Sequence, residues 1–248
     1  YPNSYKVSTI WVSCVAELTI SDSTVKALNK ADGNYALTTA YAFVTDGGAE
    51  ATIESGEYVS YGGTAAGNGS RNANNKLTIN GGTFEARYPY KDEKGAVTGR
   101  CTVWTGGGTL IINDGTFNVN KPVEGESAQT GYCVGATAGN VIINGGSFAQ
   151  VNNTDAVISA DTNATVTING GYFATMGMCV ARALGGTTGS ETNGVVTKAS
   201  GATLNITGGV FVLLAGGRSG NYVGVIRAGG GSTYGTVNIS GGTFINQR

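Results

Sequence analysis

The chain contains no histidine, and several other residue types are scarce. Among its 248 residues there are three prolines, four cysteines and two methionines, and charged residues make up only 12%. The absence of histidine removes the commonest metal ligand and the usual general base near neutral pH. The cysteines form no CxxC pair and no other zinc-ligand spacing. The sequence therefore predicts no metal site, no cofactor and no catalytic residue.

Two further absences narrow the class of protein. No run of eighteen apolar residues occurs, so membrane insertion is not expected. The 15 basic and 16 acidic residues nearly balance, which argues against nucleic acid and anionic membranes as partners. The 42 glycines do not recur at every third position, so the chain is not collagenous, and 40% hydrophobic content argues against disorder.

One short phrase recurs eight times along the chain. It consists of an aliphatic residue, a spacer, an isoleucine, a polar turn that is usually Asn-Gly-Gly, another spacer and an aromatic residue. Clear copies are LTINGGTF, LIINDGTF, VIINGGSF and VTINGGYF. The eight isoleucines are Ile20, Ile53, Ile79, Ile112, Ile143, Ile168, Ile206 and Ile239, on average about 31 residues apart. A repeat of this length indicates a solenoid or another repeat architecture.

The phrase itself predicts a strand, a sharp bend and a second strand. In the copy from Leu77 to Phe84, apolar residues alternate with polar ones before the bend, which is typical of a strand with one buried face. Strand-like segments such as AYAFVTDGG precede most copies, so one period fits a three-sided coil. A β-propeller needs about 40 residues per blade, and a leucine-rich repeat needs its own leucine and asparagine pattern. We therefore predict one all-β domain over residues 1–248, a single-stranded parallel β-helix (β-solenoid) of about eight coils. Residues 1–17 form an initial strand segment, 18–244 the repeats and 185–201 an inserted loop.

Stacking of the coils places equivalent residues in columns. The aromatic position holds six of the seven phenylalanines, which we expect to form a stack inside the rod: Phe84, Phe117, Phe148, Phe173, Phe211 and Phe244. The first position of the bend holds asparagine in four consecutive copies, which predicts a hydrogen-bonded ladder along the axis: Asn80, Asn113, Asn144 and Asn169.

Repeats of the LTINGGTF type resemble those of secreted and cell-surface bacterial right-handed parallel β-helix proteins, which have the pectin-lyase-like architecture. The resemblance extends over nearly the whole chain. It implies a right-handed coil and an extracellular or cell-surface location, and it implies no particular activity. Members that cleave polysaccharides use clustered carboxylates, often with calcium, and a basic residue on one face of the rod. Here the acidic residues are scattered, and Asp155 and Asp161 are interpreted as solvated residues that flank one strand.

A candidate ligand surface comes from the segments VARA and VIRA. They place Arg182 and Arg227 at equivalent positions of successive coils, with Ser159 one coil earlier and Asp161 nearby. Stacked arginines offer paired donors for a carboxylate, such as that of a uronic acid in an acidic glycan. The alternative is two exposed arginines paired with Asp161 or Glu191.

Cys101 and Cys133 are predicted to occupy corresponding positions of neighbouring coils. In-register partners lie within disulfide range, but their parallel Cβ vectors would strain the bond. Free buried thiols are therefore favoured over a bridge.

The last phrase ends four residues before Arg248, and no capping element is recognisable at either end of the sequence. Uncapped strand stacks are complementary to each other and generate open filaments. The leading hypothesis is an extracellular structural subunit that stacks head to tail with copies of itself. The first alternative is a glycan-binding or adhesin module of a larger surface protein, and the second is a polysaccharide lyase or hydrolase.

Overall fold

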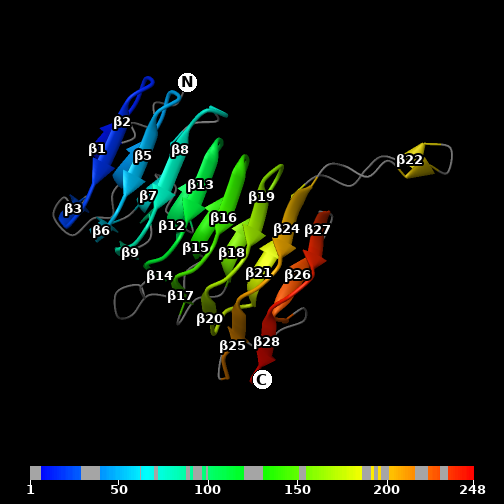
Figure 1. The fold of residues 1–248 in the computed structure, drawn as a ribbon. Coiled ribbons are helices and arrows are strands. Elements are labelled where there is room, and N and C mark those ends of the chain that lie inside the picture. Colours follow the sequence, from blue (N-terminus) through cyan, green and yellow to red (C-terminus); the bar gives the residue numbers. More distant parts are fainter. Residues whose placement is uncertain are drawn as a thin grey trace.

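The protein is a rod of stacked three-sided coils, as the sequence predicts. The computed structural model describes residues 7–28, 40–61, 63–69, 72–87, 90–91, 97–98, 100–119, 131–150, 155–185, 191–192, 195–196, 201–215, 223–229 and 234–248. Within these residues every regular element is a β-strand, and three parallel sheets of eight strands each form the sides of the rod. Figure 1 shows the coils following one another from the blue N-terminal end to the red C-terminal end. No helix long and apolar enough to cross a bilayer occurs in this part of the chain.

Each coil contributes one strand to each sheet. Sheet A contains, in order along the rod, β1 (Val7–Val12), β4 (Ala40–Thr45), β7 (Thr64–Asn68), β12 (Arg100–Thr105), β15 (Gly131–Ala136), β18 (Ala156–Ala160), β21 (Cys179–Ala183) and β26 (Ile226–Ala228). Sheet B contains β2 (Glu17–Ile20), β5 (Glu50–Ile53), β8 (Lys76–Ile79), β13 (Thr109–Ile112), β16 (Asn140–Ile143), β19 (Thr165–Ile168), β24 (Ala202–Ile206) and β27 (Gly235–Ile239). Sheet C contains β3 (Ser23–Leu28), β6 (Gly56–Tyr61), β9 (Thr83–Arg87), β14 (Thr116–Val119), β17 (Ser147–Gln150), β20 (Tyr172–Thr175), β25 (Val210–Leu213) and β28 (Thr243–Asn246).

The recurring phrase supplies sheets B and C in strict register. Ile112 pairs with Ile79 and Ile143, and Phe117 pairs with Phe84 and Phe148. The six phenylalanines and Tyr58 form one stack, with successive ring centroids 4.6–5.1 Å apart, close to the spacing of neighbouring strands. All rings of this stack except Phe244 are fully buried. The predicted aromatic column is confirmed, and it forms the centre of the core.

The bend between sheets B and C depends on glycine. Gly146 has a φ of 100°, and a Cβ atom there would lie 3.0 Å from the carbonyl oxygen of Gly115 in the preceding coil. At Gly145 a Cβ atom would lie only 2.6 Å from the carbonyl oxygen of Asn113. The two glycines therefore serve different needs, a left-handed backbone at one position and close approach of coils at the other.

The predicted asparagine ladder is also confirmed. The Nδ2 atoms of Asn113 and Asn144 each donate to the Oδ1 atom of the asparagine one coil before, at 2.7 Å, and Asn169 donates to Asn144 at 2.9 Å. Asn80 donates in turn to Glu54 at 2.8 Å, and Asn169 accepts from the Thr207 hydroxyl at 2.8 Å. The ladder thus links six coils at the surface of the rod.

Two small hairpins stand apart from the three sheets. One pairs β10 (Tyr90–Lys91) with β11 (Val97–Thr98), and the other pairs β22 (Glu191–Thr192) with β23 (Val195–Val196), both antiparallel. The second hairpin belongs to the segment predicted as an insertion over residues 185–201. Figure 1 places β22 away from the rod; most of the remaining insertion lies outside the described residues.

None of the four cysteines forms a disulfide bond, which confirms the expectation of unbridged thiols. The expected register of Cys101 with Cys133 is wrong, however, because Cys101 pairs with Tyr132 and Val103 with Val134. The offset of one residue separates the two thiols. Cys133 is fully buried, and its thiol lies 3.4 Å from the carbonyl oxygens of Phe117 and Ala149, whereas Cys101 is half-buried.

The buried thiols make stability sensitive to alkali. Burial is the main reason that the pKa of Cys179 is raised from its ordinary 9.0 to about 11. Between these values the unfolded chain loses the proton while the folded chain keeps it, so stability falls as pH rises from about 9 to about 11. We expect the loss from this thiol to approach about 1.4 kcal/mol per pH unit above pH 9, measured by urea unfolding at pH 8, 9 and 10. Cys179→Ala should reduce the pH dependence without abolishing it, because burial also raises the pKa of the Cys133 thiol. Cys14→Ala, at an exposed thiol, is the control, and equal slopes in all three proteins would contradict the assignment.

Candidate functional site

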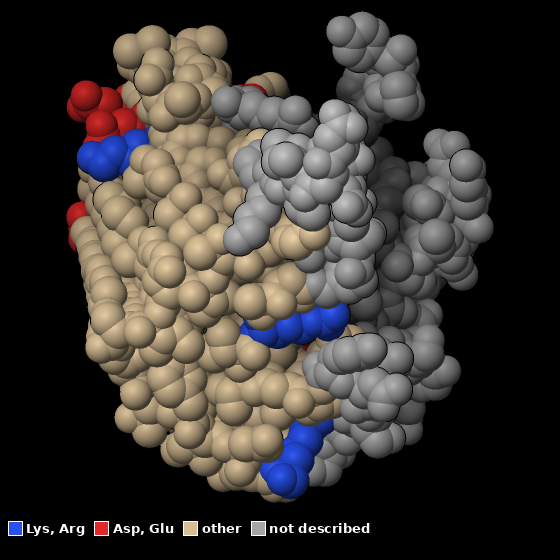
Figure 2. Space-filling model, turned by 90° about the vertical axis from the view of Figure 1, so that its right-hand side faces the viewer, with Lys and Arg blue, Asp and Glu red and all other residues tan. Residues whose placement is uncertain are grey.

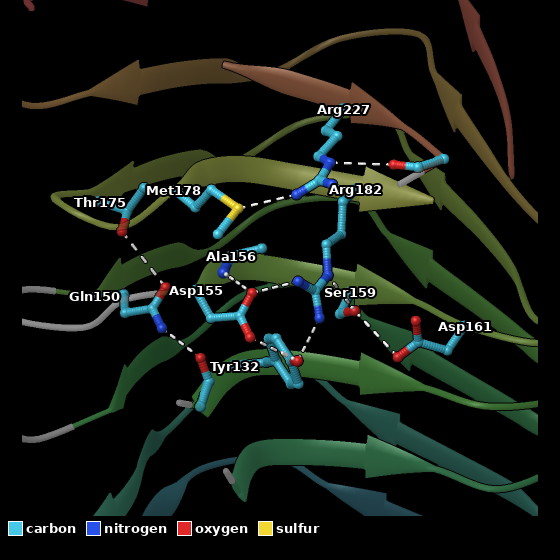
Figure 3. Close-up of polar contacts among 12 residues, drawn as sticks. Tyr132, Gln150, Asp155, Ala156, Ser159, Asp161, Thr175, Met178, Arg182 and Arg227 are labelled. Carbon is cyan, nitrogen blue, oxygen red and sulfur yellow. Dashed lines mark hydrogen bonds and ion pairs between the residues drawn. The ribbon is translucent and has the colours of Figure 1, made fainter. Parts of the chain in front are cut away.

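The outer face of sheet A carries the residues that the sequence proposed as a ligand surface. Ser159 on β18 pairs with Arg182 on β21, which pairs with Arg227 on β26. The predicted alignment of these three positions is therefore confirmed. Figure 3 shows the three side chains on neighbouring strands, with Asp155 and Tyr132 beside them.

Arg182 is the centre of this group and is only 9% exposed. Its Nε atom donates to the Ser159 hydroxyl at 2.9 Å, one terminal nitrogen forms an ion pair with Asp155, and the other donates to the Tyr132 hydroxyl. The guanidinium also lies over the Tyr132 ring, 4.9 Å from its centroid. A buried guanidinium requires such partners, because desolvation of an unpaired charge is costly.

The partners of Arg182 are themselves connected. The Tyr132 hydroxyl donates to Asp155 at 2.9 Å, and the Ser159 hydroxyl donates to Asp161 at 3.2 Å (Figure 3). Burial, followed by the charge of Asp155, raises the pKa of Tyr132, so the phenol stays protonated at neutral pH. Burial also raises the pKa of Asp161, and the charge of Arg182 and the hydrogen bond from Ser159 oppose this rise.

The network joins three successive coils. Tyr132 belongs to β15, Asp155 directly precedes β18, and Arg182 belongs to β21. The strands at this point are buried on both faces, as the continuous burial of β18 and β21 shows. The network therefore links neighbouring coils on the outer side of sheet A, on the opposite side of the sheet from the aromatic stack.

Arg227 lies in a different environment from Arg182. Its Nη1 atom lies 2.9 Å from the Met178 sulfur, and its Nε atom donates to the carbonyl oxygen of Gly229 at 3.1 Å. The side chain belongs to the coil at one end of the rod and is half-buried. The two arginines thus share a column without forming a paired donor surface, because Arg182 directs its donors to Asp155, Ser159 and Tyr132.

Two interpretations made from the sequence are wrong here. Asp155 is not a solvated turn residue, since it is only 8% exposed and pairs with Arg182. Arg182 is not exposed, and its carboxylate partner is Asp155 rather than Asp161; the side chain of Glu191 lies outside the described residues. The register of Val134 with Ile158 places Tyr132 level with Ala156, the residue after Asp155. This alignment is the signal that could have linked Tyr132 with Asp155.

The site offers little for metal chemistry. No group of three or more Cys, Asp or Glu side chains that could hold a metal ion occurs within the described ranges. Asp155 and Asp161 are the only carboxylates in the network drawn in Figure 3, and Arg182 pairs with one of them.

The second candidate site is the end of the rod formed by β26, β27 and β28. Ile239 is 52% exposed and Phe244 is 37% exposed, although Ile206 and Phe211, their partners in the preceding coil, are fully buried. The three strands are the outermost members of sheets A, B and C, as β1, β2 and β3 are at the other end. Each end therefore presents strand edges and partly open core positions.

Comparisons with known proteins identify no relative. The chain matches no protein-family model, and searches of curated proteins and of solved structures found no match.

Proposed function

We propose that this protein is an extracellular structural subunit whose copies stack head to tail, so that the coils of one rod continue those of the next. The observation that carries the proposal is the strict register of the coils, in which each strand of sheets A, B and C pairs in parallel with its equivalent one coil away. The outermost strands of one copy can therefore pair in the same way with those of a second copy. The extracellular location is supported by the resemblance of the repeats to those of secreted and cell-surface β-helix proteins.

The two ends of the rod are chemically suited to each other. If coils continue in register from one copy to the next, Val237 meets Leu18 and Ile239 meets Ile20, and Phe244 is in the column of Val25, which is already buried in the first coil. Leu18 and Ile20 are only partly buried in the first coil. Each of the three pairs is apolar, and burial of apolar area favours association by about 25 cal/mol per Å². The contact is heterologous, so it forms a chain of subunits unless the rotation between copies closes a ring.

Glycan binding and polysaccharide cleavage have less support. A site at the column of Ser159, Arg182 and Arg227 would require donors or carboxylates available on the outer face of sheet A, and Arg182 and Asp155 are buried against each other there. A ligand carboxylate would have to displace Asp155 from Arg182 before it could be bound.

Light scattering and negative-stain electron microscopy over a range of protein concentrations test the stacking proposal. The expected result is a population of rods whose length grows with concentration. Phe244→Lys should shorten the rods to single subunits, because it places a charge in the apolar contact between the last coil of one copy and the first coil of the next. Thr167→Lys, on the outer side of β19, an interior strand of sheet B, adds the same charge away from both ends and should leave assembly unchanged. A monodisperse monomer at the highest concentration would overturn the proposal.

A further inference from the structure

Charge is distributed unevenly along the rod. Residues 1–61 contain seven acidic and three basic residues, a net charge of −4. Residues 62–200 contain nine of each sign, and residues 201–248 contain three arginines and no acidic residue, a net charge of +3. Among the residues that the structure describes, the first two coils carry six acidic side chains and one basic side chain, and the coil at the other end carries two arginines and no acidic side chain. The described part of the rod is therefore negative at one end and positive at the other.

The charged side chains at the acidic end lie on the first two coils. Glu17 is exposed on β2, and Glu50 lies beside it on β5, where it pairs with Lys76. Glu54 and Glu57 follow in the same coil, and Glu57 pairs with Lys26 on β3. At the basic end, Arg227 lies on β26 and Arg248 follows β28. Figure 2 views the side of the molecule that carries β26–β28 in Figure 1; Lys and Arg appear there at separate places, and most of the Asp and Glu surface lies at one margin.

One column of sheet A places an exposed aromatic ring at one end and an arginine at the other. Strand pairing links Trp11 through Val44, Gly67, Trp104, Gly135, Ser159 and Arg182 to Arg227. Trp11 is 59% exposed, an unusual state for a side chain of this size. In a continuous stack, Arg227 of one copy is followed in the same column by Trp11 of the next. A guanidinium over an indole ring is the most favourable cation–π pair.

A second column brings a defined charge to the junction. Glu17 begins the column that continues through Glu50, Lys76, Thr109, Asn140, Thr165 and Thr203 to Thr236. Thr236 of one copy therefore lies next to Glu17 of the following copy. This pair is a convenient place to add or reverse charge without changing the core.

We propose that the partner of the basic end is the acidic end of a second copy, and that charge selects this polarity and makes assembly sensitive to ionic strength. The inference rests on the proposed stacking function. Electrostatic complementarity accelerates association and disfavours contacts between like ends, which would bring two sets of acidic coils or two pairs of arginines together. Contact of Arg227 with Trp11 fixes the rotation of one copy relative to the next.

The first test measures assembly by sedimentation velocity at 20, 150 and 500 mM NaCl. The Debye length falls from about 20 Å to about 4 Å over this range, so we expect the association constant to fall about tenfold or more. Glu17→Lys and Thr236→Glu should each weaken assembly at 20 mM NaCl by several-fold. The combined variant places opposite charges on the two sides of one contact and should recover most of the association. Thr165→Glu, in the same column but in the middle of the rod, is the matched control and should assemble like the parent protein.

The second test uses Trp11 as a reporter. Trp104→Phe leaves Trp11 as the single tryptophan, and its emission should shift to shorter wavelength as the rods form. Arg227→Ala should reduce this shift and weaken assembly by several-fold, whereas Arg87→Ala, on β9, should do neither.

The outcomes separate the two proposals. Rods that form equally well at all salt concentrations and in all charge variants would overturn the charge-selected polarity and leave stacking intact. Dimers that do not grow further would show contact between like ends and would also overturn the polarity. Absence of any assembly would overturn stacking and, with it, this inference.

Discussion

Phe148→Ala is expected to lower the free energy of unfolding by about 3–5 kcal/mol, the range for removal of a large buried aromatic side chain. Phe148 is fully buried, and its ring lies 4.6 Å from that of Phe117 and 4.7 Å from that of Phe173. Truncation removes both ring contacts and leaves a cavity in the middle of the rod. The surrounding strands cannot close it, because their register is fixed by pairing with the coils on both sides.

The matched control for this change is Phe244→Ala. Phe244 belongs to the same column but stacks on one ring only, at 5.1 Å from Phe211, and is partly exposed. We therefore expect a loss of about 1–2 kcal/mol, since the change removes less buried area. Guanidinium unfolding followed by circular dichroism, at a protein concentration where only single subunits are present, measures both values. Equal losses for the two variants would contradict a continuous aromatic stack.

Because each coil contacts mainly its neighbours, the effect of Phe148→Ala should be visible as reduced cooperativity. Stability of a solenoid approximates a sum of coil and interface contributions, so a weak central coil divides the rod into two parts. Hydrogen exchange should then show faster exchange of the amides in β14, β17 and β20 than of those in β9. Uniform acceleration over all coils would indicate that the rod unfolds as one unit.

Most of the fold could be predicted because the repeated phrase determines it position by position. Counting nine residues back from Ile112 and Ile143 gives Val103 and Val134, and the structure pairs these two residues. The mistaken pairing of Cys101 with Cys133 arose from matching residue type instead of distance from the isoleucine, since the two cysteines lie eleven and ten residues before it. Strand register follows backbone spacing, and an offset of one residue turns a side chain to the other face.

The environment of Arg182 could not be predicted in the same way. The sequence places Arg182 in register with Ser159, but it does not show that sheet A is buried on both faces at this point. A strand with one open face would leave Asp155 and Arg182 in water, which is why both were interpreted as exposed. Apart from Arg182 itself, the small and apolar residues of β18 and β21 are the only signal of two-sided burial in these segments. Because Asp155 and Arg182 are both buried, each charge requires the other as its partner.

Arg182→Met is expected to destabilise the protein by about 3–5 kcal/mol, because it leaves the buried Asp155 carboxylate without its cation. The change also removes the donors to Ser159 and Tyr132 and the contact with the Tyr132 ring. Methionine keeps most of the side-chain volume, so the loss reports the charge and the hydrogen bonds more than the packing. Urea unfolding at pH 7 measures the difference from the parent protein.

A double variant distinguishes the stability lost when the whole ion pair is removed from the stability lost when one charge stays buried without its partner. Arg182→Met combined with Asp155→Asn removes both charges, and we expect it to be more stable than Arg182→Met alone by at least about 1–2 kcal/mol, because an amide is easier to bury than a carboxylate. Arg227→Met is the matched control; its carbonyl and thioether contacts are weaker than an ion pair, and its loss should stay below about 1 kcal/mol. If Arg182→Met were no more harmful than Arg227→Met, the network would not hold the coils together, and Arg182 would be available to a ligand in solution.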